Sequence, residues 1–161
     1  MKPGDVLILD CDTKFSNYIR RFTGSDWTHV ALMGRDGKFM DYCINGRQKS
    51  SLEELIYDPS VNDKLIATPP PHVNVAKMLE EAESRYESSR YDYLCIVRLI
   101  PKLLNQRDEK NLHLFKRNFT CSSLIARSAS LATNERLFPL EFHYSQTIPD
   151  DFATYWRTYR P

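Results

Sequence analysis

The feature that most constrains the fold of this chain is a pair of apolar runs separated by a short turn. The run "HVALM" begins at His29, the turn "GRDG" follows it, and the run "KFMDYC" ends at Cys43. Two such runs split by a short loop rich in Gly and Asp are typical of an antiparallel β-hairpin. We therefore expect a hairpin over residues 29–43, and the rest of the chain must extend this sheet or cover it.

The remaining patterns predict an α+β fold in which an antiparallel sheet packs against helices. The apolar run Val6 to Leu9 and the segment "KLIAT" predict further strands. Capping residues and helical spacing of apolar positions predict helices at 16–24, 50–57, 74–86, 93–104, 118–132 and from about 149 onward.

Several helix boundaries follow from particular residues. Ser16 is the expected N-cap of the first helix and Gly24 its end, and the second is expected to open with a capping box of Ser50 and Glu53. The expected buried positions are Val75, Met78, Leu79, Ala82 and Tyr86 in the helix at 74–86, and Leu124, Ile125 and Leu131 in the helix at 118–132.

Composition narrows the classes of function. The chain of 161 residues fits one domain, 1–161, and its net charge of +1 without charged blocks argues against nucleic acid as a partner. Its apolar stretches are far shorter than the ~20 residues of a membrane-spanning helix. The first residues carry no apolar signal region, so we expect no integral membrane segment and a cytoplasmic location.

The four cysteines, at positions 11, 43, 95 and 121, contain no C-x-x-C pair. This spacing favours reduced thiols over a zinc site or a disulfide scaffold, and we expect no metal and no cofactor. Cys11, Cys43 and Cys95 lie in apolar contexts and are expected to be packing residues.

Cys121 has the most informative position of the four. If Thr120 caps the helix, Cys121 is its first residue, where unpaired N–H groups and the helix dipole favour a thiolate. The same N–H groups are suited to stabilise an oxyanion. The structural alternative is a small side chain that merely packs at a helix start.

A thiolate nucleophile needs a base, and His29 is the best placed of the four histidines. A strand would hold its ring in a fixed direction, whereas His72 and His113 lie in polar segments and His143 suits a half-buried structural role. Asp41 is the lone acid of the facing run and, if buried, needs a partner such as the His29 ring. The alternatives are a structural His29 and a solvent-facing Asp41.

Together these segments resemble the NlpC-type cysteine peptidases. "KPGDVLIL" and "THVALMGRDGKFMDYC" are similar to that family's "pGD" strand and "HVGIY" strand, and "FTCSSLIA" is similar to its "DCSGL" nucleophile helix, with Ser123 in place of the glycine. The helix follows the histidine here, whereas it usually precedes it. This order resembles the circularly permuted, YiiX-like branch, which is akin to the lecithin retinol acyltransferase group.

The resemblance implies a permuted papain-like fold with Cys121 as nucleophile, His29 as base and Asp41 as the residue that orients the histidine. It also gives Tyr91, in "YDY", a supporting role in substrate binding, and Trp27 is a candidate wall of the cleft. The implied activity is a cysteine hydrolase acting on a peptide, amide or lipid amide.

Two alternatives remain open at this point. The same triad serves an acyltransferase or lipid esterase, for which an apolar groove walled by Trp27, Phe39 and Tyr42 would be expected. A binding module without turnover is the other alternative, and contact between His29 and the Cys121 sulfur would argue against it.

Overall fold

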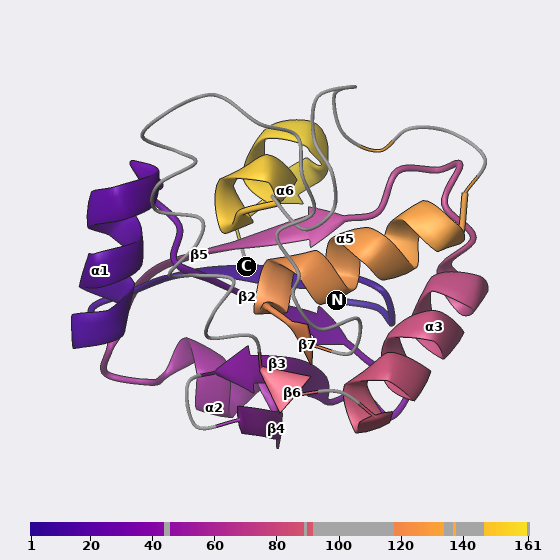
Figure 1. Ribbon diagram of the computed structural model, residues 1–161, viewed down its shortest axis with the longest axis horizontal. Coiled ribbons are helices and arrows are strands. Elements are labelled where there is room, and N and C mark those ends of the chain that lie inside the picture. The colour runs from indigo at the N-terminus through magenta and orange to yellow at the C-terminus, as the bar shows by residue number, and fades with distance from the viewer. Residues whose placement is uncertain (44–45, 89, 92–117, 134–136, 138–146, 161) are drawn as a thin grey trace.

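The computed structural model describes residues 1–43, 46–88, 90–91, 118–133, 137 and 147–160, and these form an α+β fold (Figure 1). A six-stranded antiparallel sheet has the order β4-β3-β2-β1-β5-β8. Its strands are β1 (Val6–Cys11), β2 (His29–Met33), β3 (Phe39–Cys43), β4 (Gly46–Ser50), β5 (Val61–Thr68) and β8 (Arg157–Tyr159). The helices are α1 (Lys14–Thr23), α2 (Leu52–Ile56), α3 (Val75–Ser88), α5 (Cys121–Leu131) and α6 (Pro149–Tyr155), and a small parallel pair joins β6 (Arg90–Tyr91) to β7 (Asn118–Phe119).

The predicted hairpin is confirmed as β2 and β3. Ala31 lies opposite Asp41 and Met33 opposite Phe39. Gly37, with φ of +75°, adopts the left-handed conformation that the turn requires and that glycine adopts at no steric cost. The hairpin pairs with the central strand β1, so its register places Leu9 opposite His29.

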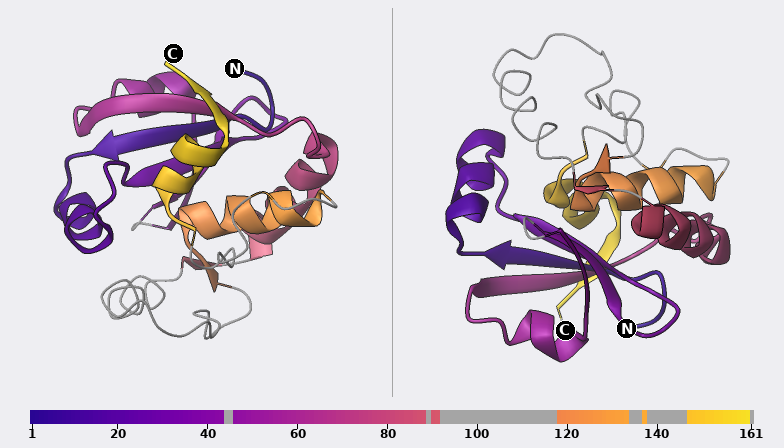
Figure 2. Two further views of the ribbon diagram at one scale, coloured as in Figure 1. Left: turned by 90° about the horizontal axis from the view of Figure 1, so that it is seen from above. Right: turned by 60° about the horizontal axis from the view of Figure 1, so that its bottom comes forward.

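The two faces of the sheet are covered by different helices (Figure 2). Along β1, Val6 and Ile8 point to the face that packs on α3, α5 and α6, while Leu7 and Leu9 point to the face where Leu55 of α2 packs. This alternation follows from the two-residue repeat of a strand. As a result β1 is buried on both faces, and α5 is held against β2 and β3.

Two helices begin at residues other than those expected. Helix α1 starts at Lys14, because Thr13 accepts the hydrogen bond from the Ser16 N–H at 3.0 Å and is the N-cap in place of Ser16. Its end at Gly24 is confirmed.

The capping box of α2 lies one residue later than predicted. It pairs Ser51 with Glu54, because a second serine follows Ser50 and a second glutamate follows Glu53. The sequence pattern fits both registers equally well, so it fixed the motif but not its position.

The other expected helices are present, but α5 begins at Cys121 rather than 118, because residues 118–119 form β7, and Val75, expected to be buried, is only partly buried. The buried face of α3 is confirmed for Met78, Leu79, Ala82 and Tyr86. In α5, Leu124 and Ile125 are buried as expected, whereas Leu131 is 42% exposed because it is the last residue of the helix and lies beyond the edge of the core. The helix expected at 93–104 lies outside the described residues.

Strands β4 and β8 lie at the two edges of the sheet and were not expected from the sequence. The first reads GRQKS, with Arg47, Gln48 and Lys49 partly or fully exposed, and the second spans three residues. Neither has the apolar alternation on which strand prediction depends. Within the described segments, no helix combines the length and hydropathy needed to cross a membrane.

Candidate active site

The N-terminus of α5 is built as the sequence predicts, with Thr120 as N-cap and Cys121 as the first helical residue. Thr120 accepts from the Ser123 N–H at 3.2 Å, and the Ser123 hydroxyl accepts from the Thr120 N–H at 2.8 Å. This is a capping box in which serine takes the place of the usual Glu or Gln. The residue that departs from the "CSGL" pattern therefore fixes the helix start, and with it the position of the thiol.

The hairpin brings His29 and Asp41 into direct contact. His29 and Ala31 share one face of β2, and Asp41 lies opposite Ala31, so the two side chains are diagonal neighbours on the same face. The imidazole Nε2 donates a hydrogen bond to Oδ1 of Asp41. Their side chains are only 16% and 7% exposed, so this is a buried, charge-assisted contact.

His29 also interacts with Cys121, and its pKa reports both contacts. Burial alone would lower the pKa of the imidazole, but the Asp41 carboxylate and the Cys121 sulfur, through charge and hydrogen bonding, raise it well above its usual value. Because Nε2 is occupied by Asp41, the nitrogen that remains for the thiol is Nδ1. The structure therefore brings Asp41 and Cys121 to the same imidazole, that of His29. The Cys121 residue itself is 8% exposed.

Tyr86 supports Asp41 from α3, which the sequence indicated only as a buried helical position. Its hydroxyl donates to the backbone oxygen of Asp41 at 3.2 Å, and its ring packs edge-on against Tyr42 with centroids 5.0 Å apart. These contacts hold the strand that carries the carboxylate. The signal available in the sequence was an aromatic with a polar end on the buried face of a helix.

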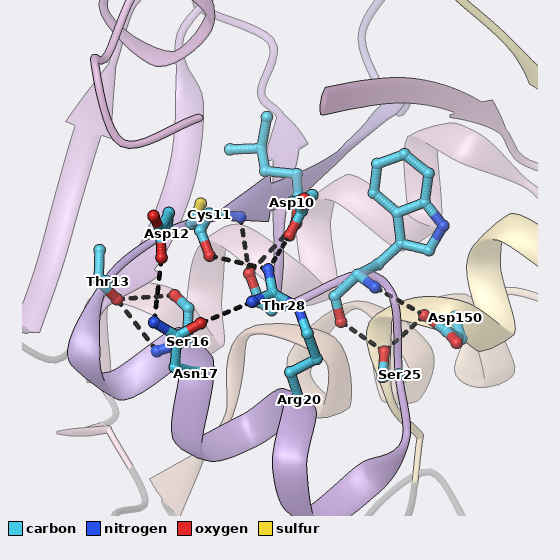
Figure 3. Close-up of polar contacts among 12 residues, drawn as sticks. Asp10, Cys11, Asp12, Thr13, Ser16, Asn17, Arg20, Ser25, Thr28 and Asp150 are labelled. Atoms are coloured by element: carbon cyan, nitrogen blue, oxygen red, sulfur yellow. Dashed lines mark hydrogen bonds and ion pairs between the residues drawn. The ribbon is translucent and has the colours of Figure 1, made fainter. Parts of the chain in front are cut away.

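The segment that precedes His29 is fixed by polar contacts to β1 (Figure 3). Thr28 is buried, its hydroxyl accepts from the Cys11 N–H at 2.9 Å, and its N–H donates to the Leu9 oxygen at 3.0 Å. Nearby, Arg20 of α1 forms an ion pair with Asp10. These contacts attach both sides of the loop to the end of β1, and the loop directs His29 into the strand.

Trp27 is partly buried against the core beside α6. The backbone N–H of Trp27 donates to Oδ1 of Asp150 at 3.0 Å, and the Ser25 hydroxyl donates to the same oxygen (Figure 3). Asp150 thus attaches the loop before His29 to the start of α6. No sequence pattern indicated this contact, which joins residues more than 120 positions apart.

A cavity of about 260 Å³ adjoins His29 and Asp41 on the face of the sheet that α1 and α2 flank. Apolar side chains from β1, α1, α2 and β5 line much of it, and polar groups such as Ser16, Gln48 and Asp58 complete it. Cys121 is not among its lining residues, because it belongs to the core on the opposite face of the sheet.

Cys11 lines this cavity and is a second thiol in the neighbourhood of His29. It is half-buried, and burial raises the pKa of its thiol, while the charge of His29 and a hydrogen bond with Thr28 lower the pKa in part. Its packing against Leu9 and Val61 agrees with the expected packing role. Of the other two cysteines, Cys95 lies outside the described residues and nothing is described for the Cys43 side chain.

The backbone of Tyr91 lies beside the segment that leads into α5. Tyr91 pairs with Phe119, which lies two residues before Cys121, so a separation of 30 positions in sequence closes to neighbouring strands. Among the other histidines, His72 is exposed, while 113 and 143 lie outside the described residues.

Of the residues considered as walls of an apolar groove for a lipid substrate, Tyr42 lines the cavity beside His29, whereas Trp27 and Phe39 are not among its lining residues. Phe39 is fully buried in the core, and Tyr42 is 1% exposed with its hydroxyl donating to the Tyr86 oxygen. Phe39 therefore serves packing, while Tyr42 is almost fully enclosed at the wall of the cavity.

In the described part of the chain, no three or more His, Cys, Asp or Glu side chains gather in a group that would hold a metal ion.

Comparison with known proteins makes the class of this α+β fold more specific. The sequence matches no protein-family model and no curated protein. Among solved structures, the fold is similar to that of metalloprotein YiiX from Escherichia coli O157:H7, with a TM-score of 0.57 and 14% identity over 86% of this chain and 69% of that chain. The protein therefore has a YiiX-like α+β fold.

Proposed function

We propose that this protein is a thiol hydrolase of amide bonds on a circularly permuted papain-like fold, with Cys121 as nucleophile, His29 as base and Asp41 as the residue that orients the imidazole. The observation that carries the proposal is the single imidazole held between a buried carboxylate and the thiol at the start of α5. Nucleophile, base and orienting group within hydrogen-bonding reach are the signature of activated-nucleophile catalysis. The order of His29, Asp41 and Cys121 along a YiiX-like fold also supports the permuted assignment.

The chemistry follows from the raised pKa of His29. Although burial alone would lower it, the contacts with Asp41 and Cys121 raise the pKa of the imidazole well above its usual value, which suits His29 to take up the proton of the attacking thiol. The thiolate attacks the amide carbonyl carbon and forms a sulfur–carbon bond. His29 gives its proton to the departing nitrogen, the C–N bond breaks, and an amine leaves. A water molecule, deprotonated by His29, then cleaves the thioester to a carboxylic acid and restores the thiol.

The helix start offers the electrostatic part of the mechanism. The first N–H groups of α5 have no carbonyl partner within the helix, and the Ser123 N–H already donates to Thr120. The N–H of Cys121 itself is suited to donate to the oxyanion that forms on the attacked carbonyl. Each such donor is worth about 10²–10³ in rate in well-studied hydrolases.

The substrate we propose is a peptide, amide or lipid amide, with Tyr91 and Trp27 as candidate contacts. Tyr91 lies on the strand paired with the segment that enters α5, and Trp27 lies two residues before His29. The backbone of Tyr91 is thus close to the start of α5, and the backbone of Trp27 is close to His29. We further propose that residues 1–161 act as one hydrolase domain in the cytoplasm.

The proposal is tested by following hydrolysis of a panel of amide and ester acyl donors by the wild type, Cys121→Ala and His29→Ala. We expect amide hydrolysis by the wild type alone, together with an acyl adduct on Cys121 detected by mass spectrometry. Release of the acyl group to an added alcohol or amine in preference to water would instead indicate an acyltransferase. An absence of turnover and adduct with every donor, or hydrolysis that depends on an added divalent metal, would overturn the proposal.

A further inference from the structure

The segment that leads into α6 contacts the helix that carries Cys121. The hydroxyl of Ser122, the residue after Cys121, donates to the backbone oxygen of Thr147 at 2.6 Å. Ser122 and Thr147 are both buried, so this bond is shielded from water. The capping box of α5 is made by Ser123, so it does not depend on the Ser122 hydroxyl. The bond therefore attaches the first turn of α5 to residue 147.

Three residues later, the same segment contacts the loop that precedes His29. Oδ1 of Asp150 accepts from the backbone N–H of Trp27 at 3.0 Å and from the Ser25 hydroxyl (Figure 3). Ser25 is buried and Trp27 packs against the core, so these bonds are partly shielded as well. Trp27 lies two residues before His29. Residues 147–150 therefore join the start of the nucleophile helix to the loop that leads into β2.

The connection between these two contacts is short and stiff. Pro149 restricts its own φ angle, and the backbone N–H of Ile148 donates to Oδ2 of Asp151 at 2.8 Å. The rest of α6 is anchored in the core by Phe152 and Trp156, whose rings meet edge-on with centroids 4.9 Å apart. Because the connecting backbone is constrained and its helix is buried, the segment holds its two ends at a fixed separation.

The two contacts of the His29 ring depend on different parts of the fold. Asp41 lies in the same hairpin, so the strand register sets that contact. Cys121 lies on a separate helix, so its distance from the ring depends on how the start of α5 sits relative to the start of β2. Proton transfer needs heavy atoms about 2.6–3.2 Å apart. A small displacement of the helix start would therefore break the contact with Cys121 and leave that with Asp41.

We propose that residues 147–150 form a clamp that holds His29 and Cys121 at reacting distance, with Asp150 as a positioning residue. This inference rests on the proposed hydrolase function, because the pair that the clamp holds is the pair of that site. Asp150 acts through the loop before His29 and not on the substrate. Its carboxylate serves as a hydrogen-bond acceptor, so an uncharged acceptor of the same shape performs the same role.

The pKa of His29 reports the contact without turnover, because Cys121 is one of the groups that raise it. In Asp150→Ala, NMR titration should show a lower pKa for His29, and iodoacetamide should alkylate Cys121 at least about fivefold more slowly at pH 7. Asp150→Asn keeps an acceptor oxygen for both donors and should retain the wild-type values. Asp26→Ala removes an exposed carboxylate from the same loop and should change neither.

Two outcomes of this comparison would overturn the proposal. The first is an unchanged pKa of His29 in Asp150→Ala, and the second is an equal fall in Asp150→Asn, which would indicate an effect of charge alone. The same exchange in a Cys121→Ala background should leave the pKa of His29 unchanged, since the contact is already absent. A fall there would mean that Asp150 acts on the ring directly and not through the clamp.

Breaking the other end tests whether the two contacts act in series. Ser122→Ala removes the bond to Thr147 and should slow alkylation of Cys121 to a similar extent. Because a clamp released at one end holds nothing at the other, the double variant with Asp150→Ala should be within about twofold of the slower single variant. Additive losses would reveal two independent local contacts and contradict the clamp. If Asp150→Ala does not fold, Ser25→Ala removes one donor and should give a smaller loss in the same direction.

The two proposals fail separately. A pKa of His29 that depends on Asp150 and Ser122, in a protein that never forms an acyl adduct on Cys121, would retain the clamp and end the hydrolase proposal. Adduct formation and amide hydrolysis that are unaffected by Asp150→Ala would retain the hydrolase and remove the clamp.

Discussion

The two described thiols near His29 differ in the features that suit one of them to the proposed role of nucleophile and the other to packing. Cys11 ends a strand, packs against Leu9 and Val61, and has a pKa raised by burial despite the nearby imidazole. Cys121 begins a capped helix and is itself one of the groups that raise the pKa of His29. Proximity to a histidine is thus insufficient, because only one thiol combines contact with the ring and the positive end of a helix.

The difference also concerns which side of the sheet each thiol occupies. Cys121 belongs to the core on the α5 face, and Cys11 to the cavity on the α2 face. His29 lies at the beginning of β2 and influences both thiols. One imidazole therefore lies between the proposed reaction centre and the cavity.

Exchanging the sulfur atoms for oxygen should give the largest contrast. Cys121→Ser should lower kcat/KM for an amide donor by at least about 10³-fold, because a hydroxyl at this site forms no thiolate. Cys11→Ser should change kcat/KM less than about threefold, since its thiol takes no part in bond formation. Steady-state kinetics of both variants measures the contrast, and a larger loss in Cys11→Ser would reverse the roles of the two cysteines.

Removing the carboxylate partner of His29 should have the next largest effect. In Asp41→Asn, burial is no longer outweighed by the carboxylate, so the pKa of His29 should fall, and kcat/KM should drop by about 10²-fold or more. NMR titration of the ring reports the pKa. Asp36→Asn is the matched control, since its carboxylate pairs with Lys49 on the surface, and a similar pKa change there would contradict the argument.

The pH dependence of alkylation should separate the two thiols. Because burial raises the pKa of Cys11, less of its thiolate is present at neutral pH, and its alkylation should accelerate as pH rises above 9. Cys121, with the imidazolium beside it, should react about tenfold faster than Cys11 at pH 7. Peptide mass spectrometry at several pH values measures both rates in one sample, and equal rates at neutral pH would remove the proposed activation.

Removing the helix cap should give the smallest effect and show whether the helix start activates Cys121. Thr120→Val should destabilise the protein by about 1 kcal/mol and slow alkylation of Cys121 a few-fold, with Cys11 unaffected. Thr13→Val, which removes the cap of α1, should cost a similar ~1 kcal/mol without slowing Cys121. Denaturant unfolding and alkylation rates compare the pair, and equal slowing by both would indicate a general loss of stability.

Local patterns determined most of the elements that carry the site. The alternation and the glycine turn fixed the hairpin, and Thr120 fixed the start of the helix that begins with Cys121. These signals involve residues a few positions apart, so they can be read without knowing the fold. For the same reason the sequence missed the edge strands, whose residues are polar or few and pair only because a neighbouring strand is there.

The burial of Asp41 shows the limit of that reading. The sequence predicted that a buried Asp41 would need the His29 ring, but it allowed an exposed carboxylate equally well. The decision came from the fold, in which the strand that carries Asp41 pairs with β2 on one side and β4 on the other, and the carboxylate meets the His29 ring and is 7% exposed. Packing, not local propensity, determined that the carboxylate is buried and paired.

By itself, then, the sequence determined the hairpin, the capped helix and the order in which His29, Asp41 and Cys121 occur. Only the tertiary structure decided that one imidazole meets both Asp41 and Cys121, that Tyr91 pairs beside the helix start, and that Cys11 faces a cavity on the other side. The physical reason is that these contacts join distant segments. Their formation depends on how the helices bury the two faces of the sheet, which no short window of sequence specifies.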